Sequence, residues 1–355
     1  MLVGQKQGSD PDVRELKRNV AWRAADRACG AVLDRLDLQY VLYPSSFAVA
    51  GDPWFRGASV VQLYNTHGSY FSHTALPFLS RRRPIVWRLS DQWPFTGHVA
   101  YSYECERWRH GCGSCPYLDE YPRLRRDRTA TLWRWKNRVY ARSRITVVAP
   151  STWLERSAKE SPLLGRFDVR RIPNGVELDV FRPRPRTPRE RPVILFASAW
   201  LDERRKGGAV LREAVAKLSD LDFELVSAGE RAAVGRPLGR LGRGELARAY
   251  ADADLFVLPT LAENLPNTIL ESLASGTPVV SFDVGGVGDA VRHLETGWLA
   301  QAPQADSLAE GIRALLGDRE LRERLGRNGR DLAEREWSQE LEASRFAALY
   351  EELAA

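Results

Sequence analysis

The chain has 355 residues, of which 44% are hydrophobic and 28% charged, so it can form two ordinary globular domains and is neither disordered nor fibrous. Its longest apolar runs, such as Val193 to Trp200, are far shorter than the roughly 20 residues that span a bilayer, and its start lacks a signal-peptide pattern. We therefore expect a cytoplasmic protein. Its net charge of +6 favours an acidic partner, which could be a phosphorylated ligand, an anionic membrane surface or nucleic acid.

Short apolar runs alternate with helical patterns along the chain. Helical patterns occur at Leu211 to Leu218 and Glu245 to Ala251, and leucines and alanines recur at helical spacing through almost all of 318–353. This alternation is typical of βαβ units with parallel sheets, so the expected fold class is α/β. Strands are predicted at 59–65, 84–90, 144–150, 192–198, 222–229, 254–259 and 278–282.

The segment from Phe181 to Pro192 is rich in proline and arginine and cannot hold a regular element. We therefore place the domain boundary there, with domains at 1–187 and 188–336 and a C-terminal helix at 337–355. Two doubly wound domains would then face each other across a cleft, and the last helix would return toward the first domain.

A polar loop follows the predicted strand at 254–259 and carries Glu263. A helix is expected to begin near Pro266, because proline suits the first turn, and its N-terminus would favour a phosphate. Glu271 lies eight residues after Glu263, so the two carboxylates need not converge as a glycosidase pair. Without further information each could equally be a solvated surface acid.

The stretch from Glu263 to Ala300 resembles the donor-site signature of retaining GT-B glycosyltransferases of family 4, in which two glutamates eight apart flank a loop and helix. Three other stretches agree with this resemblance: "IPNGVELDVFRP", "RRKGG" at Arg204 to Gly208, and "VAPSTWLERSAKES". The resemblance covers most of the chain and implies two Rossmann-like domains, with the acceptor in 1–187 and the donor nucleotide-sugar in 188–336.

The resemblance also implies roles for individual residues. Glu271 would hold the ribose hydroxyls of a UDP- or GDP-sugar, and Glu263 would lie near the transferred sugar and the diphosphate. Lys206 and Arg205 would stabilise the negative charge that grows on the departing diphosphate, so no metal would be needed. Many relatives have an additional arginine where Trp200 stands here. The remaining donor-side residues would be Asn264, Leu265, Pro266, Asn267, Arg240, Leu241, Gly285 and Gly286.

The first domain contains an aromatic and cysteine-rich insertion at about 91–122. The stretch from Val86 to Leu118 resembles a segment of family 4 enzymes from polysaccharide and O-antigen assembly, which implies a saccharide or lipid-linked acceptor. Relatives commonly have histidine where Ser90 stands, so this contact is absent or replaced. The candidates for the acceptor side are Ser90, Asp91 and His67, although His67 could also be a strand-end histidine bonded to backbone.

Cys105, Cys112 and Cys115, with His98 or His110, could form a structural zinc site, because C-x2-C brings two thiolates to one ion. Relatives often have a fourth cysteine where Val99 stands. Reduced, unligated thiols and a disulfide are the alternatives, and catalysis by these thiols is not expected.

Two basic clusters lie at Ser80 to Pro84 and Arg123 to Arg142. In the second, Leu132, Trp135 and Val139 share one helical face, which could rest on the inner face of an anionic membrane or pack on the first domain. Nucleic acid is not expected as a partner, because no recognised binding module is present.

The first residues, up to Val13, resemble the second strand of the family's first domain, so that domain is expected to lack its first strand and helix. This favours an alternative function, a degenerate nucleotide-sugar-binding protein that acts as a partner or scaffold. A sugar-nucleotide epimerase of the same fold is a weaker alternative. The presence of Glu263, Lys206 and Glu271 favours the enzyme.

Overall fold

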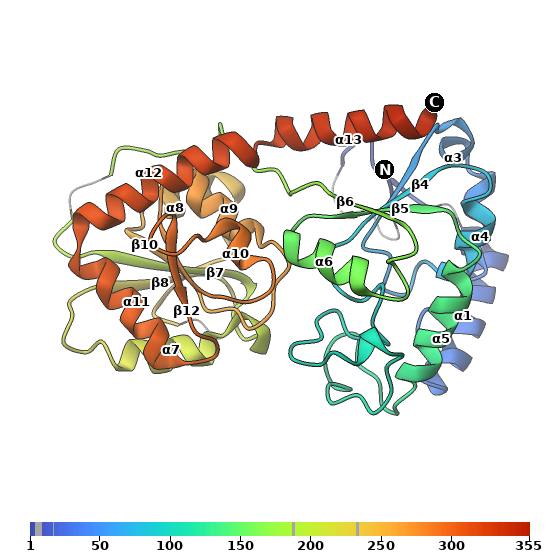
Figure 1. The fold of residues 1–355 in the computed structure, drawn as a ribbon, viewed down its shortest axis with the longest axis horizontal. Helices are drawn as coiled ribbons and strands as arrows, with labels where there is room; N and C mark the ends of the chain where they lie inside the picture. The colour runs from blue at the N-terminus through green and yellow to red at the C-terminus, as the bar shows by residue number, and fades with distance from the viewer. Residues whose placement is uncertain (4–8, 17, 187–188, 232–233) are drawn as a thin grey trace. The chain divides into compact units, whose positions relative to one another are not determined.

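The computed structural model describes residues 1–3, 9–16, 18–186, 189–231 and 234–355, and the chain divides into two compact units (Figure 1). Unit 1 consists of Met1–Pro150, Leu154–Arg171 and Ala348–Ala355. Unit 2 consists of Ser151–Trp153 and Ile172–Ala347.

Unit 1 is built on a parallel sheet with strand order β3-β4-β5-β6. Its strands are β3 (Val61–Tyr64), β4 (Ile85–Arg88), β5 (Ile145–Ala149) and β6 (Asp168–Arg171). A separate parallel pair joins β1 (Leu2–Val3) to β2 (Arg14–Glu15). The helices are α1 (Val20–Arg35), α2 (Ser45–Ala48), η1 (Val49–Gly51), α3 (Pro53–Gly57), η2 (His73–Ala75), α4 (Leu76–Leu79), η3 (Arg107–Arg109), α5 (Thr129–Tyr140) and α6 (Thr152–Glu160), of which Thr152 and Trp153 belong to unit 2.

Helix α5 forms part of the second basic cluster, Arg123 to Arg142, for which packing on the first domain and contact with a membrane were the two alternatives. Leu132 and Val139 are buried in unit 1, and the Trp135 indole donates a hydrogen bond of 3.2 Å to Thr74 Oγ1. The apolar face of this helix is therefore packed inside unit 1, while Arg134 and Arg138 stay exposed. None of the described helices is long and apolar enough to cross a membrane.

Unit 2 is built on a parallel sheet with strand order β12-β11-β10-β7-β8-β9. The predicted strands are confirmed as β7 (Val193–Trp200), β8 (Glu224–Glu230), β10 (Leu255–Leu258) and β11 (Val279–Phe282). The sequence analysis missed β9 (Arg236–Gly239), which is largely exposed and has no apolar run, and the short β12 (Gly297–Ala300). The helices are η4 (Arg204–Lys206), α7 (Gly208–Ala216), α8 (Arg243–Asp252), α9 (Asn267–Ala274), α10 (Val287–Ala290), α11 (Ala305–Gly317), α12 (Arg319–Glu336) and α13 (Gln339–Ala354), whose last residues belong to unit 1.

The division between the units lies at Ile172, earlier in the chain than the boundary expected from the proline- and arginine-rich segment. The reason is that Val176 and Phe181 are already buried in the core of unit 2. The C-terminal helical stretch is also interrupted: α12 ends at Glu336 and α13 begins at Gln339, because Ser338 forms an isolated parallel bridge with Val176.

The sheet of unit 2 determines where a ligand can bind. Strands β10 and β11 are buried along their whole length, as is usual for parallel strands covered by helices on both faces. In such sheets the ligand-binding loops follow the carboxyl ends of the strands. The loops after the neighbouring strands β7, β10 and β11 therefore lie side by side at the carboxyl-terminal end of the sheet, which is called its carboxyl edge below.

Candidate functional site

The loops that follow β7 and β10 are joined by hydrogen bonds. The carbonyl oxygen of Arg205 accepts from the Leu261 amide at 2.7 Å and from Thr260 Oγ1 at 3.0 Å. Gly207 lies between them with φ +72°, and a Cβ on it would be 1.8 Å from the Pro259 carbonyl oxygen. Only glycine allows this close approach, and it fixes Arg205 and Lys206 against the β10 loop.

The loop after β11 packs on the same backbone. Gly285 has φ +56°, and a Cβ on it would be 1.8 Å from the carbonyl oxygen of Glu263. The amide of Gly286 donates to that carbonyl at 3.3 Å. The predicted residues Gly285 and Gly286 therefore support the backbone of Glu263 and Asn264, in addition to any contact with a ligand.

Glu263 is the centre of this edge of the sheet. Its side chain is only 8% exposed, and its Oε1 accepts hydrogen bonds from Arg205 Nη1 at 2.5 Å and from Lys206 Nζ. Burial alone would raise the pKa of Glu263, but the two cations outweigh it and hold the pKa below its ordinary value. The structure thus brings together the three predicted catalytic residues, as one carboxylate shared by two cations.

The start of helix α9 lies in the same loop cluster. Pro266 is the N-cap with extended backbone and Asn267 is the first helical residue, as predicted. Asn264 is buried and its Oδ1 accepts a hydrogen bond of 2.7 Å from Ser151 Oγ, while Asn174 Nδ2 donates to Asn267 Oδ1 at 3.0 Å. Ser151 and Asn174 were not predicted, and only their place in the resembling stretches could have indicated them.

Glu271 lies one helical turn further into α9, partly buried near α8. Burial raises the pKa of Glu271 to about 7, against the opposing effects of Tyr250 and Arg243. The carboxyl group therefore changes its protonation state near neutral pH. The nearby Arg240 is exposed and pairs with Glu230 at 3.4 Å, and Leu241 is partly buried; these two follow the edge strand β9, apart from the loops that hold Glu263.

Unit 1 brings its three predicted residues together after β3 and β4. His67 Nε2 donates to Asp91 Oδ2 at 2.9 Å, and Ser90 Oγ donates to the same oxygen at 3.3 Å. A carboxylate can only accept, so Nε2 of His67 carries the proton in the bond to Asp91, and Nδ1 lies 3.3 Å from the Tyr121 hydroxyl. Tyr121 was not predicted, since nothing in its spacing connects it to His67.

A buried lysine supports the turn that carries Asp91. Lys136 of α5 is 1% exposed, its ammonium lies 3.6 Å from the centre of the Trp93 ring, and it donates to the carbonyls of Trp93 and, at 3.1 Å, Thr96. Burial lowers the pKa of Lys136 to about 7. The Trp93 amide in turn donates to Asp91 Oδ1 at 2.9 Å, so the lysine positions the acid that holds His67.

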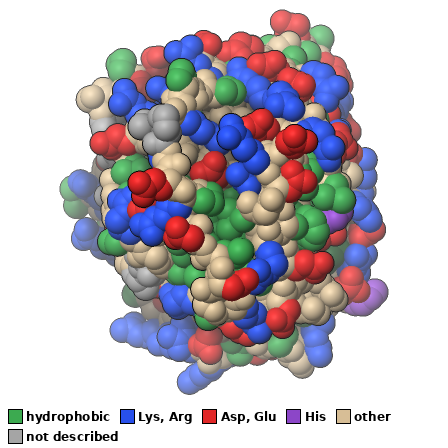
Figure 2. All heavy atoms as spheres, turned by 90° about the vertical axis from the view of Figure 1, so that its left-hand side faces the viewer, with side chains coloured by type: hydrophobic (Ala, Val, Ile, Leu, Met, Phe, Trp, Pro, Cys, Tyr) green, Lys and Arg blue, Asp and Glu red, His purple; other side chains and the backbone are tan. Residues whose placement is uncertain are grey.

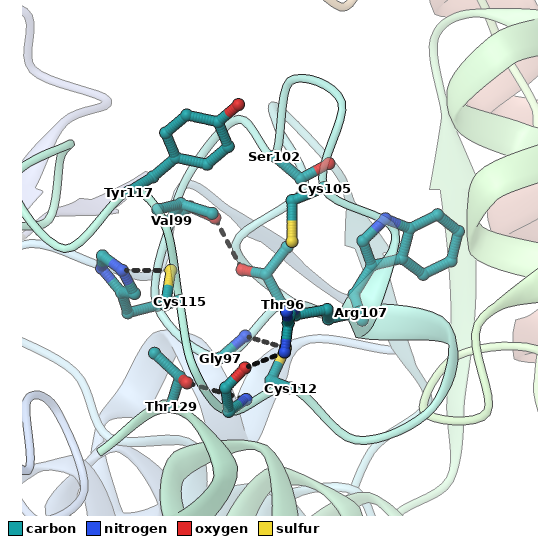
Figure 3. Close-up of a pocket in the computed structure, with 13 residues that line it drawn as sticks. Thr96, Gly97, Val99, Ser102, Cys105, Arg107, Cys112, Cys115, Tyr117 and Thr129 are labelled. Atoms are coloured by element: carbon teal, nitrogen blue, oxygen red, sulfur yellow. Dashed lines mark hydrogen bonds between the residues drawn. The ribbon is translucent and has the colours of Figure 1, made fainter. Parts of the chain in front are cut away.

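The cysteine-rich insertion encloses a cavity of about 20 Å³, lined by Cys105, Cys112 and Cys115 (Figure 3). Cys115 Sγ lies 3.4 Å from His98 Nε2, and Cys112 Sγ accepts from the Gly97 amide at 3.1 Å. His110 is exposed and does not line the cavity.

The hypothesis of a zinc site in this insertion is not supported. Across the ranges that the structure describes, no group of three or more His, Cys, Asp or Glu side chains is arranged to hold a metal ion. Cys112 and Cys115 have the Gly97 amide and His98 as neighbours, and burial raises the pKa of the Cys112 thiol to about 12. All four cysteines are free.

Comparison with known proteins relates the chain to glycosyltransferases. Residues 179–332 match the family described as Glycosyl transferases group 1. The chain is 33% identical over 210 residues to a phosphatidyl-myo-inositol mannosyltransferase of Mycobacterium tuberculosis (strain ATCC 25618 / H37Rv), which covers 53% of this chain and 55% of the relative. It is 32% identical over 195 residues to the lipopolysaccharide core biosynthesis glycosyltransferase LpsE of Rhizobium meliloti (strain 1021), covering 51% and 57%. The chain thus spans about half the length of these curated relatives.

Solved structures show the fold. Anabaena Alr3699/HepE in complex with UDP superimposes with a TM-score of 0.66 at 16% identity, covering 91% of this chain and 84% of that one. Sucrose-phosphate synthase from Thermosynechococcus elongatus gives 0.65 at 20% identity, covering 86% and 75%. The α/β fold with parallel sheets therefore matches that of GT-B glycosyltransferases.

Glu263→Gln is expected to lower the free energy of unfolding at pH 7 by roughly 1.5–3 kcal/mol, the range for a lost hydrogen bond to a charged group. A carboxyl group whose pKa is lowered by folding stabilises the protein above its unfolded pKa, and this contribution is lost as the pH falls through the folded pKa. The difference from wild type, measured by urea denaturation, should therefore shrink below about pH 4. The exposed Glu340→Gln is the control, and a pH-independent deficit in Glu263→Gln would contradict the ion-pair account.

Gly285→Ala is expected to destabilise the protein by about 1–3 kcal/mol or more. Alanine would be forced into the left-handed backbone conformation of Gly285, and its Cβ would collide with the Glu263 carbonyl oxygen. Gly244→Ala in α8 is the matched control, since a Cβ there has no atom within 4 Å. It should be neutral or stabilising by up to about 1 kcal/mol. Equal thermal unfolding of the two variants would refute the close approach.

Proposed function

We propose that this protein is a retaining glycosyltransferase that moves a sugar from a UDP- or GDP-sugar to a saccharide or lipid-linked saccharide acceptor in cell-surface polysaccharide synthesis. The observation that carries the proposal is the contact of Glu263 with both Arg205 and Lys206 at the carboxyl edge of β7 and β10. The family match of residues 179–332 and the sugar-transferring relatives point in the same direction.

The proposed chemistry follows from the charges at this edge. When the glycosidic bond to the nucleoside diphosphate breaks, negative charge grows on the phosphate oxygens. Arg205 and Lys206 supply two positive charges against one carboxylate, so one net positive charge is held in place before the donor arrives. Because Glu263 and the loop backbone already orient these cations, little reorganisation is needed when the diphosphate leaves.

Other residues would bind the two substrates. Glu271 would accept hydrogen bonds from the ribose hydroxyls, and the amides at the start of α9 would face phosphate oxygens. In unit 1, the bond of His67 to Asp91 leaves Nδ1 beside the Tyr121 hydroxyl, a polar pair suited to an acceptor sugar.

Donor binding and the stereochemistry of transfer test the proposal separately. A thermal-shift panel of UDP-, GDP- and ADP-sugars should show stabilisation by about 2.7 kcal/mol when a true donor is present at about 100 times its Kd. NMR of the first product should show the anomeric configuration of the donor. Stabilisation without transfer would indicate a nucleotide-sugar-binding protein, and an inverted product would refute the retaining mechanism.

Lys206→Ala is expected to lower kcat by about 10²–10³, because the lysine meets charge that develops only as the diphosphate leaves. Initial rates with saturating donor measure the effect. Lys217→Ala, which removes a lysine ion-paired to Asp306 elsewhere in unit 2, is the control and should retain wild-type kcat. An unchanged kcat in Lys206→Ala would mean that the diphosphate binds elsewhere.

Donor affinity is expected to increase with pH near neutrality, because only ionised Glu271 can accept both ribose hydrogen bonds. With the pKa of Glu271 raised to about 7, the ionised fraction rises about tenfold from pH 6 to pH 8, and the Kd for UDP-glucose should fall by the same factor. Glu271→Gln should bind more weakly and without this pH dependence. Calorimetric titrations would measure both, and an equal pH dependence in the variant would exclude Glu271 as its source.

A further inference from the structure

A groove of about 850 Å³ lies in unit 2, at the amino-terminal ends of the strands, whereas Glu263 lies at their carboxyl-terminal ends. Its walls come from described residues of 183–186 and 189–192, from positions just before β10 and β11, such as Asp254 and Pro278, and from helix α12. Because β7, β10 and β11 are parallel, these positions mark their amino ends. The groove is therefore separate from the loops proposed to bind the donor.

Positive charge is in excess in this groove. Among the described residues that line it there are eight arginines and five acidic side chains. Figure 2 shows one face of the molecule, on which Lys and Arg side chains are intermixed with Asp and Glu. Five of the arginines have acidic partners: Arg186 with Asp254, Arg189 with Asp252 and Arg319 with Glu323 inside the groove, and Arg330 with Glu334 and Arg191 with Asp222 outside its lining.

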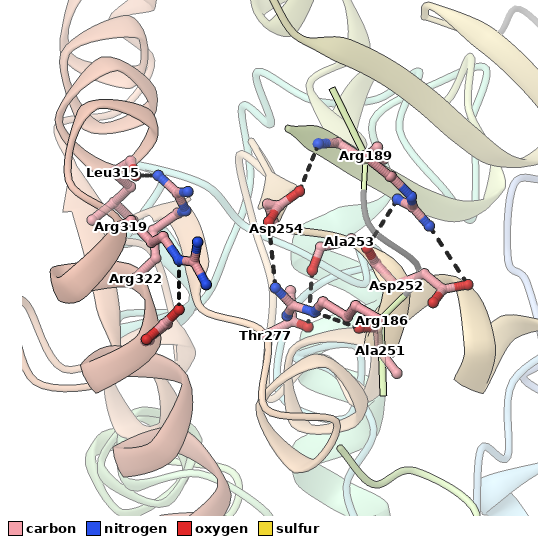
Figure 4. Close-up of polar contacts among 12 residues, drawn as sticks. Arg186, Arg189, Ala251, Asp252, Ala253, Asp254, Thr277, Leu315, Arg319 and Arg322 are labelled. Carbon is pink, nitrogen blue, oxygen red and sulfur yellow. Dashed lines mark hydrogen bonds and ion pairs between the residues drawn. The ribbon is translucent and has the colours of Figure 1, made fainter. Parts of the chain in front are cut away.

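Other arginines are held by neutral groups, which orient the guanidinium without cancelling its charge. Arg322 Nη1 donates to the carbonyls of Leu315 at 2.6 Å and Leu316 at 2.7 Å, and Figure 4 shows it beside Arg319 on the same helix. Arg184 Nη2 donates to the Val180 carbonyl at 3.3 Å, and its Nε is buried with no hydrogen-bond partner among the described residues. Guanidinium groups held in this way are preorganised for an anion.

The arginines also repel one another across the groove. Burial lowers the pKa of Arg322, and the charges of Arg186 and Arg319 lower it further, although Asp254 opposes them. An anionic ligand between Arg186 and α12 would relieve the cost of keeping these like charges together.

We propose that this groove binds a ligand that carries several phosphate groups. Guanidinium groups match the oxygens of phosphate in a bidentate manner, and the volume is within the roughly 300–1,000 Å³ of small-molecule sites. The phosphates could belong to a soluble phosphate ester or to the headgroups of anionic lipids, and the chemistry that recognises them is the same.

The test compares two double variants of equal charge in the full chain. Arg319→Gln/Arg327→Gln removes two exposed arginines that line the groove, and Arg248→Gln/Arg324→Gln removes two exposed arginines that do not. One probe is inositol hexakisphosphate, titrated by calorimetry. The other is a vesicle of phosphatidylcholine with about 30% phosphatidylglycerol, followed by sedimentation.

At least one probe should bind wild type, with an affinity that falls as salt is raised. The groove variant should weaken binding by at least about tenfold, and the control by less than about threefold. Arg319→Lys/Arg327→Lys should restore only part of the affinity, because lysine keeps the charge but not the bidentate geometry. Binding of the soluble probe alone identifies a free phosphate ester, whereas groove-dependent binding to vesicles identifies lipid headgroups.

Three results would overturn the proposal: neither probe binds, the control variant loses as much affinity as the groove variant, or Lys206→Ala abolishes binding of inositol hexakisphosphate. The last result would show that the phosphates bind at the donor loops. Because the groove and those loops lie at opposite edges of the sheet, failure here leaves the proposed transfer reaction untouched.

Discussion

The structure of the candidate site depends on one buried carboxylate that two cations share. Glu263 would be costly to bury alone, and Arg205 and Lys206 would repel each other without it. Their contact requires the β7 and β10 loops to meet, which the parallel order of the sheet and the close approach of Gly207 to Pro259 make possible. The β11 loop then packs on the Glu263 backbone through Gly285. The strand order, the two glycines and the opposite charges therefore all favour the contact of Glu263 with Arg205 and Lys206.

Unit 1 also has an acid bound to a basic side chain after its parallel strands, with a histidine in place of the arginine and lysine of unit 2. His67 and Asp91 follow the carboxyl ends of β3 and β4, and their 2.9 Å hydrogen bond orients the imidazole ring. Lys136 neither touches this pair nor reaches solvent, but its bonds to the Trp93 and Thr96 carbonyls hold the turn on which Asp91 sits. In both units, polar groups after parallel strands are oriented by partners distant in sequence.

Unit 2 contains positive charge at both edges of its sheet, under different constraints. At the carboxyl edge Arg205 and Lys206 are mostly buried and paired to a buried acid, which suits a transient charge inside a closed site. At the amino edge Arg186 and Arg319 are more exposed, and their acidic partners are partly solvated. Such pairs contribute little to stability, so anion binding there would disturb the fold less.

The sequence by itself determined the α/β class, seven of the strands and the helix that begins after Pro266, because apolar runs and proline positions are local. The resemblance to a family added predicted roles for Glu263, Lys206 and Glu271, and these roles stay predictions. Only the tertiary structure decided which distant groups meet: Tyr121 with His67, Ser151 with Asn264, and the arginines at 184, 186, 189 and 191 with those of α12. The tertiary structure also puts the division between the two units at Ile172. It places three of the cysteines around one cavity, where the described side chains form no group arranged to hold a metal ion. These outcomes depend on strand order and side-chain packing, which connect residues that no local pattern relates.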